Sequence, residues 1–340
     1  MESYIRLNHP IFFHACASAV GYEEARGNFG EFFDYHDDSD RFGAKTWENA
    51  EGELSRITLN LALKKGGLGQ DDIGLLCAGD LQNQCVASST GLGQLGIPYL
   101  GLYGACSTCG EGLLVASLAL NAVPEMRYAA AVTTSHNCAA ERQFRLPLEY
   151  GGQRTPTAQW TATAGGAFIL SRARKPGAPA VTAVMPGRIV DSGISDAANM
   201  GAAMAPAVVD SLVRWFRATA TTPADYSLVV TGDLGAEGSS LLAELMQAQG
   251  YDLGARHQDC GRILYDRETQ DVHSGGSGCG CSAALLAAHY LPYLTTGELR
   301  DILFLATGAL MSPGNIQQGG TISGIAPVIR ITRGDCVSGH

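Results

Sequence analysis

Two segments of this chain, about 150 residues apart, repeat one pattern of an acidic residue, a short apolar run and a Gly-Asp-Leu turn. The first is DIGLLCAGDL, from Asp72 to Leu81, and the second is DYSLVVTGDL, from Asp225 to Leu234. Each follows a stretch with apolar residues at helical spacing: Leu54, Ile57 and Leu61 before the first, and Val208, Val209, Leu212, Val213 and Phe216 before the second. A helix leading into a buried strand is one α/β unit, so its recurrence predicts an internal duplication.

The residues after each unit extend this parallel. Residues 123–137 read as a strand followed by a loop and 161–172 as a further strand, while 297–313 and 321–333 supply a strand, a glycine turn and closing strands in the second half. The boundary falls in RARKPGAP, which gives halves of 1–175 and 176–340. We therefore predict an α/β fold of two similar halves, with ligand sites where loops converge beyond the strand ends.

Composition excludes several classes of function. The net charge is −10 and the 23 basic residues form no cluster in the sequence, which argues against a nucleic-acid-binding surface. The most apolar windows are near a dozen residues long, whereas about 20 are needed to span a bilayer. The N-terminus MESYIRLNHPIFF lacks the pattern of a secretory signal, so synthesis in the cytoplasm is expected. Without such a signal, the 10 cysteines are expected to be reduced thiols.

One cysteine occupies a position suited to chemistry. In GACSTCGEGL, Cys106 follows the apolar run IPYLGLY and precedes LLVASLAL, which places it at a strand-to-helix turn. The N–H groups and positive dipole end of the following helix favour a thiolate, the reactive form of cysteine. Cys106 is therefore a candidate nucleophile; the alternative is a small apolar residue packed in the core.

The other cysteines suggest a metal or redox site as an alternative. Cys106-x-x-Cys109 and Cys279-x-Cys281 together offer four sulfur ligands. Zinc sites usually pair two CxxC segments at short separation, but here about 170 residues intervene and one segment is only CxC. We expect neither a metal nor any other cofactor.

The order of these motifs resembles the thiolase and ketoacyl synthase superfamily over nearly the whole chain. The GAC turn, the strand near residue 134, TAGGAFILS, HSGGSGCGCSA and GALMSP carry this resemblance. It implies a thiolase-like fold of two pseudo-duplicated βαβ halves in an α/β/α/β/α layering, with Cys106 at the position of the acyl-accepting cysteine. More closely, HPIFF, GDLQNQ, YLGLYGACST, TTSHN, AERQFR, EYGGQ, MGAAMAP, GGSGCGCSA and ATGAL resemble the stage V sporulation protein AD family of spore-forming bacteria.

The chain departs from the superfamily pattern where proton transfer would take place. Where a thiolase usually presents Gly-His-Pro, the sequence from Gly276 to Cys281 is GSGCGC, without histidine. Where a thiolase carries its second cysteine, the sequence from Ala306 to Ala309 is ATGA. Carbon–carbon bond formation through a thioester needs such groups, so we expect the pocket to persist without its proton-transfer apparatus.

The closer resemblance implies dipicolinic acid, alone or with calcium, as the ligand. This flat ring with two carboxylates needs donors at two ends and apolar walls on its faces. The candidate ligand-binding residues are Cys106, Ser107, His136, Arg142, Arg145, Asp80, Gly276, Ser277 and Gly278. Each of these residues also has a structural alternative. The arginine pair is then in solvent, bonded to Glu141 and Glu149, or at a subunit interface. His136 is then a buried core histidine, Asp80 holds a turn, and the glycines allow close packing.

Together these observations predict a non-catalytic protein that binds dipicolinic acid and supports its uptake into the developing spore. The resemblance implies a homodimer at the spore inner membrane, acting with integral membrane proteins of the same sporulation system. Because the sequence has no membrane-spanning segment, that association would be peripheral. The alternative is an active acyltransferase with Cys106 as nucleophile and His136 as its candidate partner.

Overall fold

The computed structural model describes residues 4–144 and 154–337. The strands of the main sheet are β1 (Ile5–Val20), β2 (Tyr35–His36), β3 (Ile73–Gly79), β4 (Tyr99–Gly101), β5 (Tyr128–Ser135), β7 (Ala164–Ser171), β8 (Ala180–Met185), β9 (Leu228–Thr231), β10 (His257–Asp259), β12 (Asp301–Leu305) and β15 (Val328–Thr332). Two small ladders pair β6 (Trp160–Thr161) with β11 (Gly276–Ser277) and β13 (Gly308–Leu310) with β14 (Ser323–Ile325).

The longer α-helices are α2 (Trp47–Gly66), α4 (Thr108–Ala122), α6 (Met200–Thr219) and α7 (Gly235–Ala248). The shorter ones are α1 (Tyr22–Ala25), α3 (Val86–Leu92), α5 (Asn137–Phe144), α8 (Cys260–Ile263), α9 (Cys279–Leu285), α10 (Leu291–Thr296) and α11 (Pro313–Gln317). A π-helical turn over Leu286–Tyr290 joins α9 to α10.

The strand order repeats between the two halves of the sheet. The first half runs β4-β3-β5-β7-β1 and the second β10-β9-β12-β15-β8, and the strands β1 and β8 pair antiparallel where the halves meet. In each half, the first three strands of this order are parallel to one another. The fourth strand pairs antiparallel with the third, and the fifth pairs antiparallel with the fourth. The repeated helix, strand and Gly-Asp-Leu turn of the sequence thus correspond to α2 with β3 and α6 with β9, which confirms the expected pair of similar α/β halves.

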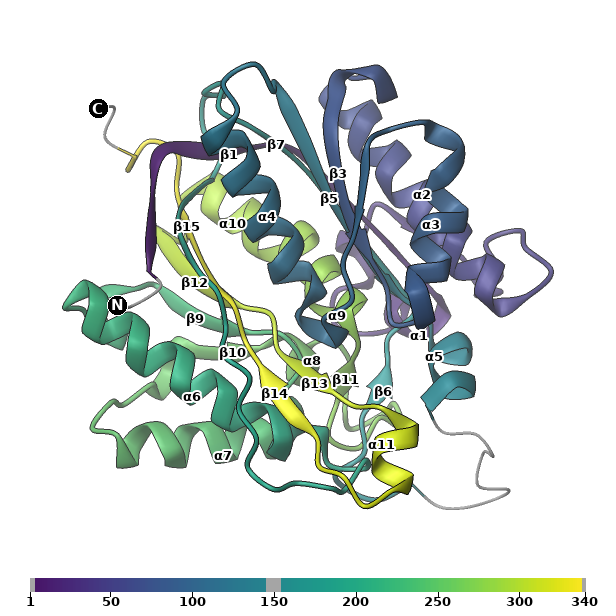
Figure 1. Cartoon of the computed structure of the whole chain (residues 1–340), viewed down its shortest axis with the longest axis vertical. Coiled ribbons are helices and arrows are strands. Elements are labelled where there is room, and N and C mark those ends of the chain that lie inside the picture. Colours follow the sequence, from purple (N-terminus) through teal and green to yellow (C-terminus); the bar gives the residue numbers. More distant parts are fainter. Residues whose placement is uncertain (1–3, 145–153, 338–340) are drawn as a thin grey trace.

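Helices cover both faces of each half (Figure 1). Helix α2 packs on β1, β5 and β7 with α3 beside it, and α6 packs against α7 at the outer side of the second half. Helices α4 and α9 lie between the halves, because α4 contacts β3 and β5 as well as β8 and β15. The result is the expected succession of helix, sheet, helix, sheet and helix layers.

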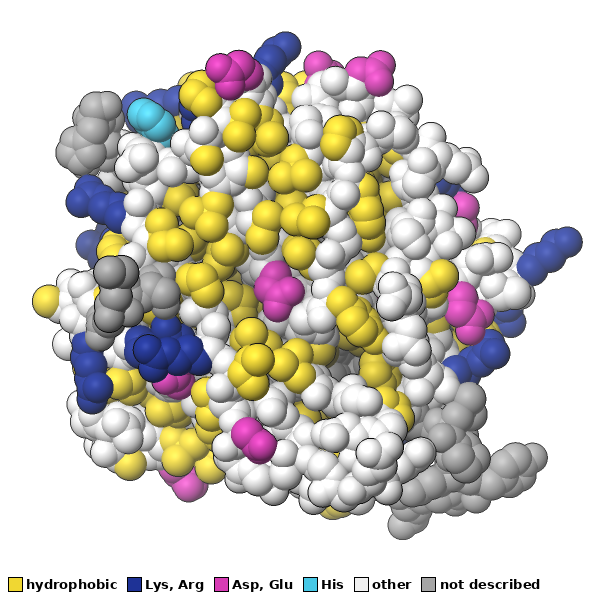
Figure 2. Space-filling model, viewed as in Figure 1, with side chains coloured by type: hydrophobic (Ala, Val, Ile, Leu, Met, Phe, Trp, Pro, Cys, Tyr) yellow, Lys and Arg dark blue, Asp and Glu magenta, His cyan; other side chains and the backbone are white. Residues whose placement is uncertain are grey.

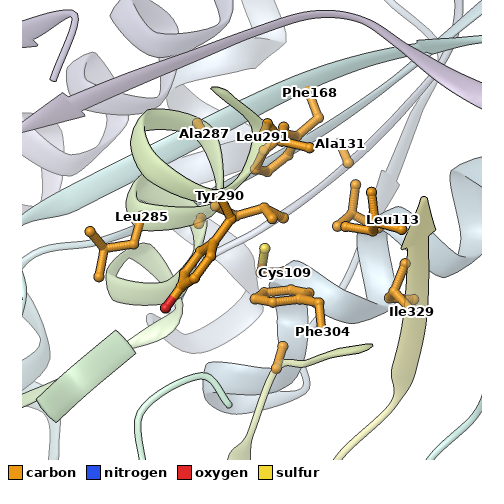
Figure 3. Packing of buried hydrophobic residues seen from close by; sticks show 14 of the residues in the cluster. Cys109, Leu113, Ala131, Phe168, Leu285, Ala287, Tyr290, Leu291, Phe304 and Ile329 are labelled. Carbon is orange, nitrogen blue, oxygen red and sulfur yellow. The ribbon is translucent and has the colours of Figure 1, made fainter. Parts of the chain in front are cut away.

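The largest apolar cluster fills the middle layer. In Figure 3, Leu113 of α4 and Tyr290 of the π-helical turn lie among Phe168 of β7, Phe304 of β12 and Ile329 of β15, so both halves supply the cluster. Each of these side chains is at most 1% exposed. At about 1.5–3 kcal/mol per buried large apolar side chain, this layer is a main source of stability and holds α4 firmly in place.

Glycine pairs allow the outer helices of each half to cross at close range. A Cβ atom on Gly91 of α3 would lie 2.0 Å from the carbonyl oxygen of Gly52 on α2. In the second half, a Cβ atom on Gly238 of α7 would lie 2.8 Å from Cα of Gly201 on α6. Any side chain at these positions would force the helices apart, which explains part of the high glycine content.

One local expectation from the sequence is wrong. The residues after β5 form the helix α5 instead of a loop, because Asn137–Phe144 packs against α2 and β6. The expected helix before β3 is present as α2, with Leu54 buried and Ile57 and Leu61 half-buried. The buried face of α2 is rotated toward Glu51, Ser55 and Leu59, since α2 must contact both the sheet and α3.

Within the described ranges, no helix is long and apolar enough to cross a bilayer. All 10 cysteines are free thiols, and most of them are buried.

Candidate functional site

Cys106 lies in a tight turn that connects β4 to α4. The turn begins at Gly104, and Ala105 adopts a left-handed backbone with φ of 53°. That conformation costs a residue with a Cβ atom about 1–2 kcal/mol. The N–H of Ser107 donates to the carbonyl of Gly104 at 3.2 Å, which closes the turn and leaves Cys106 just before the start of α4. The sequence therefore located the strand-to-helix turn correctly.

The side chain of Cys106 lines a cavity of about 240 Å³ that is formed by both halves of the chain. The first half contributes residues after β3 and β4 and on α5 and β6, and the second half contributes the start of α6, β11 and the loop after β13. The lining residues are Leu81, Tyr103, Ala105, Cys106, Ala140, Glu141, Phe144, Thr161, Met200, Ser277, Ala309, Leu310, Met311 and Ser312. Most of this lining is apolar.

The charged group that faces the sulfur is a carboxylate. The carboxylate of Asp233, which follows β9, lies close enough to the thiol of Cys106 to affect its pKa. Burial raises the pKa of the Cys106 thiol well above its usual value, and the negative charge of Asp233 raises that pKa further. The expectation of a thiolate from the helix position alone is therefore wrong, because burial and a nearby carboxylate outweigh the end of the helix dipole.

Asp233 is held by donors from the second half. Its carboxylate accepts hydrogen bonds from the hydroxyl of Thr307 at 2.6 Å, the backbone N–H of Gly278 at 2.8 Å and the hydroxyl of Ser277 at 3.2 Å. Burial raises the pKa of Asp233, while these donors act in the opposite direction. The glycine turn does bind an anion, as its sequence suggested, but the anion is the protein's own carboxylate.

Of the candidate residues, Cys106 and Ser277 line the cavity together. Ser107 does not, because its hydroxyl donates to the carbonyl of Gly104 at 2.6 Å and to Glu111 at 2.8 Å. Gly276 lies in β11, where its carbonyl accepts from the side chain of Gln159 at 2.7 Å. Gly278 has a φ of 100° and directs its N–H to Asp233, so these two glycines serve local structure.

His136 is directed away from the thiol. It is fully buried, and its Nε2 lies 2.8 Å from the carbonyl oxygen of Asp40, with the ring 5.4 Å from that of Trp47. Burial lowers the pKa of His136, so its neutral form is favoured. His136 is absent from the lining of the cavity, and the structure does not support it as the partner of Cys106.

Arg142 and Asp80 are also absent from the described lining of the cavity. The guanidinium of Arg142 forms an ion pair with Glu48 at 3.2 Å on the surface of α5, and Arg145 lies outside the described residues. Asp80 accepts from the backbone N–H groups of Gln82 at 2.9 Å and Ser88 at 2.7 Å. Asp80 thus holds the turn after β3 and the start of α3, which is the structural alternative considered from the sequence.

The four-sulfur alternative is not supported. Among the described residues, no group of three or more His, Cys, Asp or Glu side chains is arranged to hold a metal ion. The thiol of Cys106 lies beside Asp233, and the thiol of Cys279 donates to the carbonyl of Thr134 at 3.0 Å.

Several residues close to Cys106 were not among the candidates predicted from the sequence. The sequence places Asp233 and Asp80 at the same point of one repeated motif, although the two carboxylates have different surroundings. Glu141 and Phe144 on α5 and Tyr103 before the GAC turn also line the cavity. The proximity of Glu141 and Phe144 to Cys106 follows from the packing of α5, which the sequence did not reveal as a helix. The hydroxyl of Thr161 donates to Glu141 at 3.2 Å, which fixes this carboxylate at the cavity wall.

The layered fold and the cysteine at the start of α4 define a thiolase-like protein. Among solved structures, the chain is similar to a variant of OleA from Xanthomonas campestris (TM-score 0.60, 14% identity, covering 96% of this chain and 100% of that one). It is also similar to 3-oxoacyl-[acyl-carrier-protein] synthase III from Aquifex aeolicus VF5 (TM-score 0.58, 12% identity, covering 94% and 99%). At these identities the likeness concerns the fold alone.

Sequence comparison gives the family. The profile of the family described as Stage V sporulation protein AD matches residues 2–332. Stage V sporulation protein AD of Bacillus subtilis (strain 168) is 43% identical over 318 residues, which cover 94% of this chain and 93% of that protein. The chain belongs to the stage V sporulation protein AD family, and this membership supports a role in sporulation.

Proposed function

We propose that this protein binds dipicolinic acid in the cavity beside Cys106 and supports its uptake into the developing spore without transforming it. The observation that carries this proposal is a retained cavity whose buried thiol, Cys106, lies beside the carboxylate of Asp233, with the pKa of the thiol raised by burial. A protonated thiol is a poor nucleophile. A mostly apolar cavity with a few polar groups is typical of a binding site for a small molecule.

The cavity suits a flat ring with polar ends. Phe144 and Tyr103 supply aromatic surface, and the hydroxyl groups of Ser277, Thr161 and Ser312 supply polar groups around it. A volume of about 240 Å³ limits the ligand to a small molecule.

Charge favours the calcium chelate over the free dianion. The described lining contains one carboxyl group, Glu141, and no lysine or arginine. Burying two ligand carboxylates there without a cation would cost several kcal/mol. A 1:1 calcium chelate is neutral, and the Glu141 carboxylate offers an oxygen ligand of the type that calcium prefers.

Calorimetric titration with dipicolinate tests the proposal. We expect saturable heat with one ligand per chain, and tighter binding with equimolar calcium than with a chelator present. Pyridine-2-carboxylate, which lacks the second carboxylate, is the matched ligand control and should bind more weakly. Absence of saturable heat at millimolar dipicolinate, with and without calcium, would remove this ligand.

An acyltransferase is the second candidate function. The apolar lining of the cavity and the placement of Cys106 on a thiolase-like fold favour it. In the proposed binding protein, incubation with acyl-CoA should leave the intact mass unchanged, because the raised pKa of Cys106 keeps the thiolate scarce. A stable acyl adduct that disappears in Cys106→Ala would instead establish the acyltransferase.

The proposal also includes a homodimer at the spore inner membrane, acting with integral membrane proteins of the same system. The edge strand β4 has unpaired backbone on one side, and its residues Tyr99 and Leu100 are 40% and 42% exposed. An exposed apolar edge strand is a favourable surface for pairing with a second chain. Sedimentation velocity measures the oligomeric state directly.

A further inference from the structure

A second concavity, of about 880 Å³, lies apart from the Cys106 cavity and shares no lining residue with it. Strand β12 runs between the two sites: Asp301 at its start contacts Arg330 of this groove, and Ala309 beyond its end lines the cavity. The groove is lined by Tyr4, Arg6, Leu7, Asn8, His9, Pro10, Phe12, Arg172, Ala173, Arg174, Thr182, Ala183, Arg330, Thr332, Cys336 and Val337. We call it the basic groove.

Strand register creates the floor of the basic groove. Ala183 of β8 pairs with Arg6 of β1 on one side and with Arg330 of β15 on the other. Cross-strand partners direct their side chains to the same face of a sheet, so the two arginines flank a small residue. Two strand spacings separate them by about 10 Å. The pairing of β1 with β8 is interrupted between Arg6 and Ile11, which opens the groove further.

The groove concentrates positive charge on an acidic protein. Its described lining holds four arginines and His9 but no aspartate or glutamate, whereas the whole chain has a net charge of −10. Arg330 is paired with Asp301 at 3.2 Å, but Arg6 and Arg174 are exposed and have no ion-pair partner among the described residues. Lys and Arg side chains gather at the left edge of Figure 2, the side on which Figure 1 shows both termini.

Apolar residues lie between these charges. The lining includes Tyr4, Leu7, Pro10, Phe12 and Val337. A ligand that fills the groove must therefore offer both negative charges and apolar groups. Carboxylates on alternate residues of an extended chain are about 6.6 Å apart, and those four residues apart are about 13 Å apart. Flexible arginine side chains whose origins are about 10 Å apart can meet such a pair.

We propose that the basic groove binds an extended acidic segment of a protein partner, with carboxylates on one edge of the segment and apolar side chains between them. A single phosphate offers no apolar group for Tyr4, Leu7 and Phe12, which also line the groove. A bilayer surface is flat, whereas Arg6 and Arg330 flank the floor of a concave groove. The inference is independent of the ligand in the Cys106 cavity.

A model peptide tests the proposal on the full-length protein. The probe is a fluorescein-labelled peptide of alternating glutamate and leucine, read by fluorescence anisotropy, with the glutamine and leucine peptide as its uncharged counterpart. We expect saturable binding of the acidic peptide that weakens as salt rises from about 50 to about 200 mM, because screening reduces charge attraction. Arg6→Gln with Arg174→Gln should weaken binding at least about tenfold, which corresponds to about 1.4 kcal/mol.

The variants separate groove binding from net charge and from unfolding. Arg6 and Arg174 have no ion-pair partner within the described ranges, so their replacement should leave the thermal transition unchanged. The matched control is Lys64→Gln with Arg217→Gln, which removes the same charge from exposed positions on α2 and α6 and should leave binding unchanged. Equal binding of the uncharged peptide, or equal affinity of both double variants, would overturn the proposal. Phosphatidylglycerol vesicles binding with the same arginine dependence would also overturn it, in favour of a membrane surface.

Discussion

Ala140→Phe should weaken dipicolinate binding at least about 100-fold, equivalent to about 2.8 kcal/mol. Ala140 lies on α5, is 3% exposed and lines the cavity of about 240 Å³ beside Cys106. A phenyl ring added at this position would occupy space that the ligand needs. Because the ring projects into a cavity and not into close-packed core, its cost to folding should be at the low end of the about 1–3 kcal/mol typical of overpacking.

Calorimetry and thermal unfolding together check this expectation. Ala140→Ser is the matched control, since it alters the same position with little added bulk and should retain binding. Unchanged affinity in a folded Ala140→Phe protein would mean that dipicolinate binds elsewhere on the chain. Loss of binding in both variants would show that the position, and not the volume of the cavity, is responsible.

Asp233→Ala should reduce the free energy of unfolding by about 3–5 kcal/mol. Asp233 is 1% exposed, accepts hydrogen bonds from Thr307, Gly278 and Ser277, and lies beside the Cys106 thiol. The hydroxyl donors can turn to other acceptors, but the backbone N–H of Gly278 cannot, and it would remain buried without a partner. The substitution also leaves a cavity where loops of both halves meet.

Chemical denaturation measures this effect, with Asp252→Ala as the control for loss of an exposed carboxylate. That control should change the free energy of unfolding by no more than about 0.5 kcal/mol. A loss of under about 1 kcal/mol in Asp233→Ala would contradict a structural role for this carboxylate. Removing its negative charge should also lower the pKa of the Cys106 thiol, since that charge now raises it.

Much of the fold could be read from local patterns. The apolar runs before each Gly-Asp-Leu turn predict β3 and β9, and the glycine-containing run from Ala164 predicts β7. These predictions succeed because strand and turn preferences depend on residues that are close in the chain. The face of α2 was harder to predict, because this helix packs against both the sheet and α3 and has no simple apolar stripe.

The candidate site was predicted less completely, and two residues show why. His136 follows an apolar strand, as a group near a strand-end site would, but the start of α5 directs it to the carbonyl of Asp40. Asp80 and Asp233 share one motif, yet Asp80 holds the start of α3 while Asp233 faces the thiol. Identical local sequence gave different roles because the loops that approach each aspartate come from distant parts of the chain.

The sequence by itself determined the duplicated α/β architecture, the turn that carries Cys106 and membership in a sporulation protein family. Only the tertiary structure decided that the thiol is buried with a raised pKa, that its neighbour is a carboxylate and that arginines gather in a separate groove. The physical reason is that strand and turn formation depend on near neighbours in the chain. The pKa of a buried group and the charge of a groove depend on residues that folding brings together.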